Sequence, residues 1–258
     1  MVIDFLIALY YIIVYMQPKK SLLKRLIKID VILLVIIAAG LIAIRLSRQP
    51  EPVYHPSIAA IEAYFKQGES LNAYNEARQY SQEHPGEFTA YKYLGEALFQ
   101  IERYAESTEN FKAVLQDNTL ANSTKAEIFY LIGRNYDFLT DSDTAVSYFQ
   151  EAIKIDPNYS PAYNSLGMIA LRKKNYDEAL SFFGKELFLI PDSENNPLSS
   201  HSYYYLAQVY FETDNYPKAQ QMIEAAQKLA PQLRELNLNL LLNNIESLRL
   251  KIEEKLIK

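Results

Sequence analysis

The side chains that most often carry out catalysis or bind metals are few and scattered in this sequence. It contains no cysteine, which excludes thiolate catalysis, disulfides and cysteine-based zinc sites. The three histidines, His55, His84 and His201, are far apart, and no two have the spacing of a metal pair on one helix. No glycine pattern for phosphate binding and no G-x-S-x-G nucleophile motif occurs. We therefore predict a protein that is not an enzyme, with no catalytic residue, no metal site and no cofactor.

The charged residues do not suggest a reactive site either. Neighbouring carboxylates such as Asp141 and Asp143, or Glu253 and Glu254, lie in polar turns or near the end of the chain, where a solvated surface explains them. Residues 1–50 hold seven Lys and Arg against two Asp and Glu, whereas the remainder holds 19 basic and 29 acidic residues. Because nucleic-acid binding depends on Lys and Arg that neutralise phosphates, this acidic remainder argues against a nucleic-acid partner.

The elements that would position a binding site are visible as a repeat. Small, aromatic and proline residues recur at a spacing of 34 residues, each in a position typical of two packed amphipathic helices. Glycine and alanine stand where two helices approach closely, and aromatic rings fill the space beside them. In residues 126–159 the pattern consists of Phe129, Gly133, Tyr136, Ala145, Phe149, Ala152 and Pro157. It returns in residues 88–121, 160–193 and 200–233, and more weakly in residues 54–87.

This spacing resembles the tetratricopeptide repeat family, whose unit is a 34-residue helix–turn–helix. The resemblance covers residues 54 to about 233 and implies an all-α solenoid of about five helix pairs, a fold typical of protein–protein interaction scaffolds. Two short insertions, residues 122–125 and 194–199, fall at junctions between repeats, where we expect them to loop out without disturbing the stacking.

The resemblance also implies a binding surface, because the first helix of each repeat lines the concave face in this family. A partner peptide or helix is expected there, since aromatic residues and arginine dominate binding energy at interfaces. The alternative is that some of these rings only fill a tight superhelix. The implied groove residues are Phe65, Lys92, Glu96, Phe99, Tyr130, Arg134, Phe138, Asn164, Met168, Leu171, Arg172, Tyr204, Gln208 and Phe211.

Some family members hold the terminal carboxylate of a partner with Lys and Asn side chains. Lys92 stands at the matching lysine position of this sequence. However, Glu96 replaces one expected asparagine and Leu131 replaces the other. We therefore expect no such carboxylate clamp here.

The first 50 residues predict a membrane anchor. Residues 1–16 are almost wholly apolar, residues 17–30 carry five basic side chains, and residues 31–44 form an unbroken apolar run. Extended to residues 27–46, this run reaches the roughly 20 residues that cross a bilayer, because Lys28 and Arg45 can extend towards the headgroups. By the positive-inside rule, residues 17–30 lie in the cytoplasm and the repeats outside it. The proline-rich residues 47–56 form a linker between the anchor and the repeats.

Several alternatives stay open at the two ends of the chain. Residues 1–16 are either a second span or an over-extended start, and the anchor is either retained or cleaved as a signal peptide near Ala38-Ala39-Gly40. A buried soluble helix is the remaining interpretation of the apolar run. Residues 234–258 carry a heptad seam, which predicts a C-terminal capping helix or a short coiled coil for self-association. The seam consists of Leu238, Leu241, Ile245, Leu248 and Ile252.

The sequence as a whole predicts a non-enzymatic scaffold that is anchored in the inner membrane and exposes its repeats on the periplasmic side. Its architecture resembles bacterial single-span proteins that serve translocon, flagellar or secretion assemblies. The alternative function is a chaperone-like assembly factor that binds exported polypeptides through the concave groove. The expected partners are a protein in the groove and the membrane at the N-terminal segment.

Overall fold

The computed structural model describes residues 55–233 and 238–257, together with residues 11, 35 and 37–42. The chain divides into two units, Met1–His55 and Pro56–Lys258, and the second unit holds the repeats. The predicted apolar segment 1–16, basic segment 17–30, anchor 27–46 and linker 47–56 lie almost entirely outside the described residues. Within the residues that are described, no helix combines the length and the apolar character that a membrane span requires.

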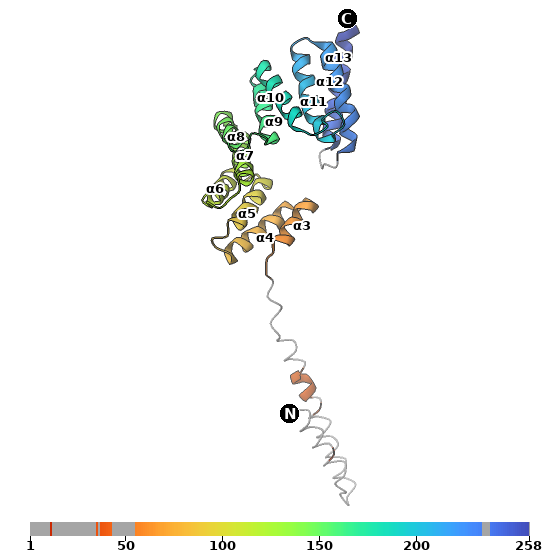
Figure 1. Ribbon diagram of the computed structural model, residues 1–258. Helices are drawn as coiled ribbons and strands as arrows, with labels where there is room; N and C mark the ends of the chain where they lie inside the picture. Colours follow the sequence, from red (N-terminus) through yellow and green to blue (C-terminus); the bar gives the residue numbers. More distant parts are fainter. Residues whose placement is uncertain (1–10, 12–34, 36, 43–54, 234–237, 258) are drawn as a thin grey trace, which may run out of the picture. The chain divides into compact units, whose positions relative to one another are not determined.

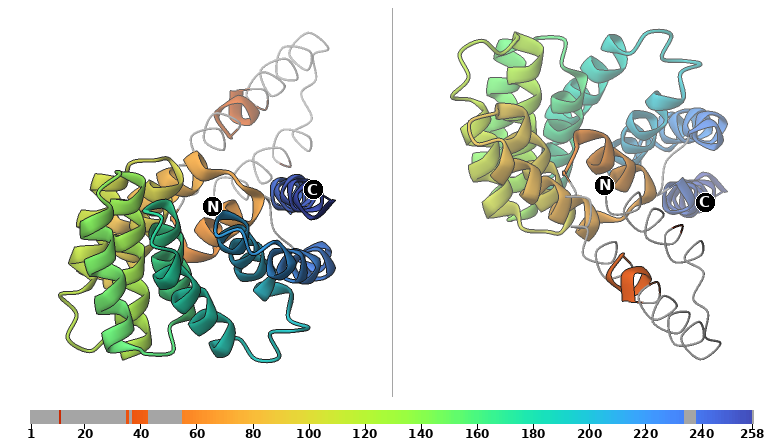
Figure 2. Two further views of the ribbon diagram at one scale, coloured as in Figure 1. Left: turned by 90° about the horizontal axis from the view of Figure 1, so that it is seen from above. Right: turned by 90° about the horizontal axis from the view of Figure 1, so that it is seen from below.

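The described part of the second unit is all-α and consists of helix pairs followed by one long helix. Two short 3-10 helices, η1 (Pro197–Ser199) and η2 (Ala230–Gln232), lie before α11 (Ser200–Glu212) and after α12 (Tyr216–Leu229). The pairs follow one another in chain order, from orange to blue in Figures 1 and 2, and each packs against the next. The α-helices are α3 (Ile58–Gln67), α4 (Ser70–Glu83), α5 (Phe88–Gln100), α6 (Tyr104–Val114), α7 (Asn122–Phe138), α8 (Ser142–Ile155), α9 (Ser160–Arg172), α10 (Tyr176–Leu189), α11 (Ser200–Glu212), α12 (Tyr216–Leu229) and α13 (Leu238–Ile257).

In the three middle pairs a glycine on the first helix faces a phenylalanine on the second. A Cβ atom on Gly133 would lie 2.6 Å from the ring of Phe149, and one on Gly167 would lie 2.6 Å from the ring of Phe183. Gly95 and Phe111 have the same relation, and all three rings are fully buried. The glycine is therefore needed for close approach of the two helices, as the repeat pattern predicts.

The two outer pairs fill the same space with other residues. Ile61 and Ala77 occupy the two positions in the first pair, while Ala207 and Ile223 occupy them in the last, and all four are fully buried. A large side chain on one helix is thus always matched by a small one on its neighbour. Volume is conserved across the contact although the residue types change.

The turn inside each pair also repeats. The residues Gly68, Glu102, Thr140, Lys174 and Asp214 stand at the same place in the five pairs, and each has a positive φ between 56° and 74°. In this left-handed conformation the chain reverses within a few residues and starts the second helix. Only Gly68 adopts it without steric cost.

The two insertions behave differently from one another. Residues 122–125 do not loop out as predicted, because α7 begins at Asn122 and contains them as an additional helical turn. No Gly or Pro interrupts this stretch, so the helix extends backwards into it. The insertion at residues 194–199 does leave the helical path: a turn around Asp192 leads into η1, which Asn196 caps through its side chain.

The C-terminal helix α13 lies against the last helix pair. Its side chains Leu241, Ile245, Leu248 and Ile252 are buried in one cluster with Ala207 and residues of α12. These are four of the five residues of the predicted heptad seam. The seam therefore packs within the chain, at the position expected of a cap, while self-association through residues 234–258 stays a prediction.

Candidate protein-binding site

Aromatic side chains from three consecutive helices meet on the face lined by the predicted groove residues, which we call the groove face. The rings of Phe99 on α5 and Phe138 on α7 pack edge to face with centroids 5.3 Å apart. Tyr104, at the start of α6, stacks on Phe138 at 5.0 Å and contacts Phe99 at 5.4 Å. Phe138 stays 54 % exposed, although apolar rings of this size usually bury most of their surface. Two predicted groove residues from different repeats thus form one surface.

Arg134 on α7 extends this aromatic cluster. Its guanidinium carbon lies 4.4 Å from the ring centroid of Phe99, 5.9 Å from that of Tyr130 and 6.0 Å from that of Phe138. Cation–π contacts of this kind contribute about 0.5–2 kcal/mol each, depending on how far they are desolvated. The rings therefore hold the guanidinium in place on the groove face.

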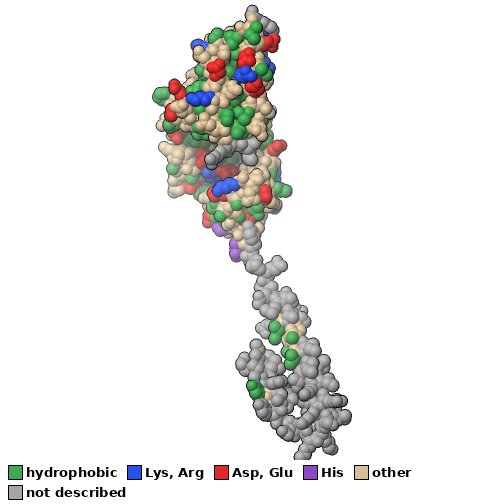
Figure 3. Space-filling model, turned by 90° about the vertical axis from the view of Figure 1, so that its right-hand side faces the viewer, with side chains coloured by type: hydrophobic (Ala, Val, Ile, Leu, Met, Phe, Trp, Pro, Cys, Tyr) green, Lys and Arg blue, Asp and Glu red, His purple; other side chains and the backbone are tan. Residues whose placement is uncertain are grey.

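Charged pairs flank the cluster on both sides. Lys92 on α5 lies 3.0 Å from Glu127 and 3.8 Å from Glu96, and Arg172 on α9 pairs with Asp137 on α7. Burial raises the pKa of the Glu96 carboxyl above its ordinary value, although the charge of Lys92 acts in the opposite direction. On the face drawn in Figure 3, acidic and basic side chains are interspersed among apolar ones, and the described residues there form no continuous basic patch.

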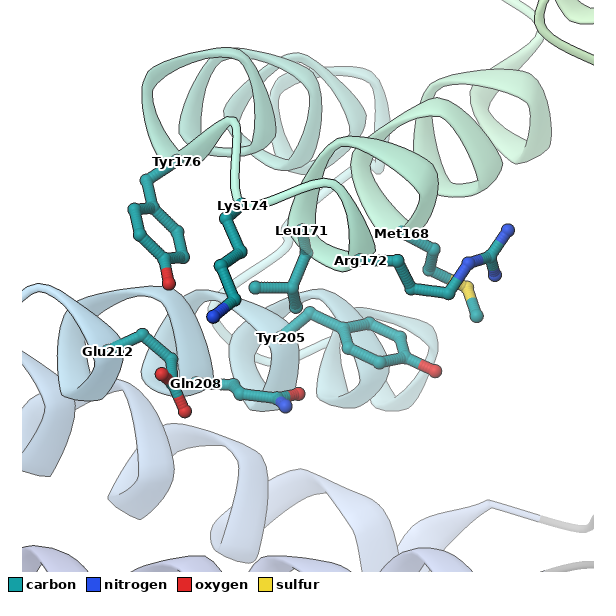
Figure 4. Close-up of a pocket in the computed structure, with 8 residues that line it drawn as sticks. All are labelled: Met168, Leu171, Arg172, Lys174, Tyr176, Tyr205, Gln208 and Glu212. Carbon is teal, nitrogen blue, oxygen red and sulfur yellow. The ribbon is translucent and has the colours of Figure 1, made fainter. Parts of the chain in front are cut away.

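A pocket opens further along the groove face, between α9 and α11. Its volume is about 290 Å³, and its wall combines apolar and polar side chains, as Figure 4 shows. Tyr176 comes from the start of α10, and Lys174 from the turn before it. A partly apolar hollow of this size suits one large side chain of a partner rather than a cofactor. The lining residues are Met168, Leu171, Arg172, Lys174, Tyr176, Tyr205, Gln208 and Glu212.

Comparison with known proteins agrees with this architecture. Family models described as tetratricopeptide repeat match residues 58–120, 126–159 and 159–232. The chain belongs to the tetratricopeptide repeat family. It is 31 % identical over 86 residues to the human Tetratricopeptide repeat protein 6, which covers 33 % of this chain and 16 % of that protein. It is 25 % identical over 192 residues to the TPR repeat-containing protein MJ1428 of Methanocaldococcus jannaschii, covering 68 % and 32 %. The chain thus spans less than a third of the length of either relative.

Solved structures of other tetratricopeptide repeat proteins share the fold. The thermophilic protein TTC0263 of Thermus thermophilus aligns with a TM-score of 0.55 at 16 % identity, covering 77 % of this chain and 96 % of that one. Cut9, crystallised as the APC/C hetero-tetramer Cut9–Hcn1, aligns with a TM-score of 0.56 at 17 % identity, and the alignment covers 72 % of this chain and 35 % of that one. A MamA protein aligns with a TM-score of 0.52 at 17 % identity, and the alignment covers 68 % of this chain and 90 % of that one. At these identities the likeness shows the fold alone.

Some of the predicted groove residues of these tetratricopeptide repeats lie together in the structure, while others contact neighbouring helices of the chain. Phe99, Tyr130, Arg134 and Phe138 form the aromatic cluster. Met168, Leu171, Arg172 and Gln208 line the pocket, and Lys92 and Glu96 form a charged pair on α5. Phe65 stacks on Tyr93 at 6.5 Å.

Three other predicted residues serve mainly to hold the repeats together. Asn164 donates a hydrogen bond of 2.8 Å to the buried carboxylate of Glu186. Tyr204 and Phe211 are partly buried against the cluster that joins the last pair to α13. All three residues nevertheless remain partly exposed.

The prediction from sequence omitted Lys174, Tyr176 and Tyr205, which line the pocket. Each stands outside the inward positions carried over from the family. Lys174 stands in the turn with positive φ and Tyr176 stands two residues later at the start of α10, and both side chains point towards α11 in Figure 4. Tyr205 directly follows the predicted groove residue Tyr204, and the centroids of the two rings lie 5.2 Å apart. The residue next to a predicted groove position thus also reaches the pocket.

Lys92, at the position of the clamp lysine, is paired with carboxylates of the chain itself. Within the part of the chain that the structure describes, no three His, Asp or Glu side chains are grouped to hold a metal ion. Lys92 donates both of its hydrogen bonds to Glu127 and lies beside Glu96. Its charge is therefore already neutralised by two carboxylates, which would also repel the carboxylate of a partner.

Proposed function

We propose that this protein is a non-enzymatic scaffold that binds one defined partner protein on the groove face of its repeats. The observation that carries the proposal is the cluster of Phe99, Tyr104, Arg134 and Phe138, in which the exposed ring of Phe138 lies beside a half-buried cation on one surface. Aromatic residues and arginine are the types that contribute most binding energy at protein interfaces. The adjoining pocket adds a hollow for one anchoring side chain.

The relatives support the proposal only in general terms. Cut9, which shares the fold, was crystallised in an assembly with a second protein, Hcn1. Tetratricopeptide repeats stack into an extended curved surface, and such surfaces are used to bind polypeptides. The second candidate is a chaperone-like factor that binds many exported chains. The exposed ring of Phe138 favours it, because an apolar surface without directional polar contacts accepts varied sequences.

We further propose that residues 27–46 anchor the protein in the inner membrane, with the repeats on the periplasmic side as part of an envelope complex. The support comes from sequence: an apolar stretch of sufficient length follows a basic segment, and only Arg45 and Arg48 follow closely after it. Reporter fusions after residue 50 and at the C-terminus test this topology. Activity of a periplasm-dependent reporter at both sites is the expected result, and activity of a cytoplasm-dependent reporter at either site contradicts it.

The binding proposal is tested by crosslinking in intact cells, followed by identification of the captured proteins. One dominant partner is expected for a scaffold, whereas many unrelated exported proteins would establish the chaperone-like function instead. The double variant Phe99→Ala with Phe138→Ala should lose the partner. Phe188→Ala is the matched control, because Phe188 is 80 % exposed but lies on α10, a second helix of a pair. Unchanged capture by the double variant contradicts the groove face as the binding site.

A further inference from the structure

Arg134 carries a charge that the rest of the described chain does not compensate. Its side chain is half-buried among aromatic rings, and its guanidinium makes cation–π contacts with three of them. Among the described residues, no carboxylate pairs with it and no hydrogen bond leaves its five N–H donors. A cation that is partly withdrawn from water without an anion loses hydration energy, so the site is incomplete as it stands.

The other described arginines show that this arrangement is unusual within the molecule. Arg103, Arg172 and Arg249 each pair with a carboxylate, and Arg78 is exposed on α4. Asp137 stands three residues after Arg134 on the same helix, a spacing that allows an ion pair, yet it pairs with Arg172 instead. The acidic solenoid therefore has carboxylates within reach of the groove face, but none of those described is directed at Arg134.

We propose that Arg134 binds the side-chain carboxylate of an Asp or Glu in the bound segment of the partner, beside an apolar residue that packs on Phe138. This inference rests on the proposed groove function. A guanidinium binds a carboxylate through two parallel hydrogen bonds, and the contact of its central carbon with the Phe99 ring at 4.4 Å holds the Arg134 side chain in place for them. The exposed ring of Phe138 offers the apolar contact next to it.

The surroundings of Arg134 favour a side-chain carboxylate of the partner over the carboxylate of its C-terminus. The groove face continues on both sides of the cluster, with Lys92 and Glu127 before it and the pocket around Arg172 after it. A terminal carboxylate would need a second cation or amide beside Arg134, and Lys92 is already held by Glu127.

The test uses three short peptides and the full-length chain, purified in a mild detergent with isotope-labelled arginine. The first is acetyl-Phe-Asp-Leu-amide, which carries one side-chain carboxylate. The second, acetyl-Phe-Asn-Leu-amide, has nearly the same shape without the charge. The third, acetyl-Phe-Asn-Leu with a free C-terminus, moves the charge to the chain end. The Nε–Hε resonance of Arg134, identified by its loss in Arg134→Gln, reports binding during titration.

We expect the Asp peptide to shift this resonance saturably and the Asn amide, which cannot form the charged hydrogen-bonded pair, to bind at least about tenfold more weakly, a difference of about 1.4 kcal/mol. Isothermal titration calorimetry measures the peptide affinities of the Arg134 variants, which lack the reporter resonance. Arg134→Gln should remove the preference for the Asp peptide, and Arg134→Lys should restore only part of it because lysine cannot form the planar fork. Arg78→Gln should leave the preference unchanged. Equal binding of the Asp and Asn peptides, binding of the free-terminus peptide alone, or no shift with any peptide would each overturn the proposal.

The same variants separate this inference from the function on which it depends. If Phe99→Ala with Phe138→Ala abolishes partner capture in cells but the Asp and Asn peptides bind equally well, the groove function is supported and the proposed carboxylate site at Arg134 is wrong. If the Asp peptide is preferred while the double variant still captures the partner, Arg134 binds a carboxylate, but the groove function and the assignment of that carboxylate to the partner are both wrong.

Discussion

The helix pairs 126–159 and 160–193 are built on the same pattern but differ at a buried position on their second helices. Both place a glycine against a buried phenylalanine, Gly133 with Phe149 and Gly167 with Phe183. On the second helix, however, the first pair has Ala152 where the second has Glu186. Ala152 is fully buried, and Glu186 is only 7 % exposed. One pair therefore presents an apolar seam to the next repeat and the other a polar one.

The difference is compensated on the neighbouring helix of the same pair. Tyr130 stands on α7 where Asn164 stands on α9, so a large ring accompanies the small alanine and a small amide accompanies the longer glutamate. Asn164 donates to the Glu186 carboxylate at 2.8 Å, and the hydroxyl of Ser202 on α11 lies beside it. The comparison shows that a repeat tolerates a buried carboxylate where an adjacent residue supplies a hydrogen-bond donor.

Transferring the carboxylate to the apolar seam should have the largest effect. We expect Ala152→Glu to lower the free energy of unfolding by about 3–5 kcal/mol, because a buried charge without a partner is strongly destabilising. In this pair Tyr130 stands at the position that Asn164 holds in the next pair, so no amide is present there to donate a hydrogen bond to the new carboxylate. Urea unfolding followed by circular dichroism measures the change. Gln150→Glu is the control, since it adds the same charge at an exposed neighbouring position and should change stability by less than about 0.5 kcal/mol. Equal unfolding free energies of the two variants would show that water reaches the side chain at position 152.

The shared feature of the two pairs, the glycine–phenylalanine contact, should respond next most strongly. Gly133→Ala places a Cβ within 2.6 Å of the Phe149 ring, and we expect a net loss of about 1–2 kcal/mol in unfolding free energy despite the better helix propensity of alanine. Adding Phe149→Ile should recover most of it, because Ala207 and Ile223 already use this combination in the last pair. Additive losses in a double-mutant cycle would contradict the conserved-volume explanation.

The polar seam should make stability depend on pH. Burial raises the pKa of the Glu186 carboxyl above its ordinary value of 4.5, although Asn164 and Ser202 act in the opposite direction. The folded state then holds its proton at pH values where the unfolded state has lost it. Stability from this group is full below about pH 4.5 and falls as the pH rises to the folded-state pKa.

Glu186→Gln keeps the acceptor for Asn164 but cannot ionise, so the difference in unfolding free energy between the two proteins should grow in favour of the variant across this interval. Urea unfolding at a series of pH values measures it. Glu96, whose pKa burial also raises, is present in both proteins and cancels. A difference that does not change with pH would show that Glu186 is solvated in the folded protein.

The repeat pattern predicted the all-α fold and its five helix pairs because glycine, alanine and aromatic positions report helix contacts that are local in sequence. It did not predict that Asn122 starts α7, since four additional residues without Gly or Pro carry no signal that separates a loop from a helical turn. For the binding site, positions carried over from the family identified Phe99, Arg134 and Phe138 as neighbours on one face. They could not show that Asn164 is engaged, because its partner Glu186 breaks the pattern on another helix.

The smallest expected difference between the two pairs lies in their turns. Thr140 and Lys174 both adopt a positive φ, at 64° and 61°. A branched Cβ is the more crowded of the two in this conformation, so the first pair carries more strain here than the second. We expect Thr140→Gly to raise the free energy of unfolding by about 0.5–1 kcal/mol, after allowance for the greater freedom of glycine in the unfolded chain, and Lys174→Gly to raise it less. Thermal unfolding of the two variants side by side measures the order, and a larger gain for Lys174→Gly would show that side-chain branching does not set the strain in these turns.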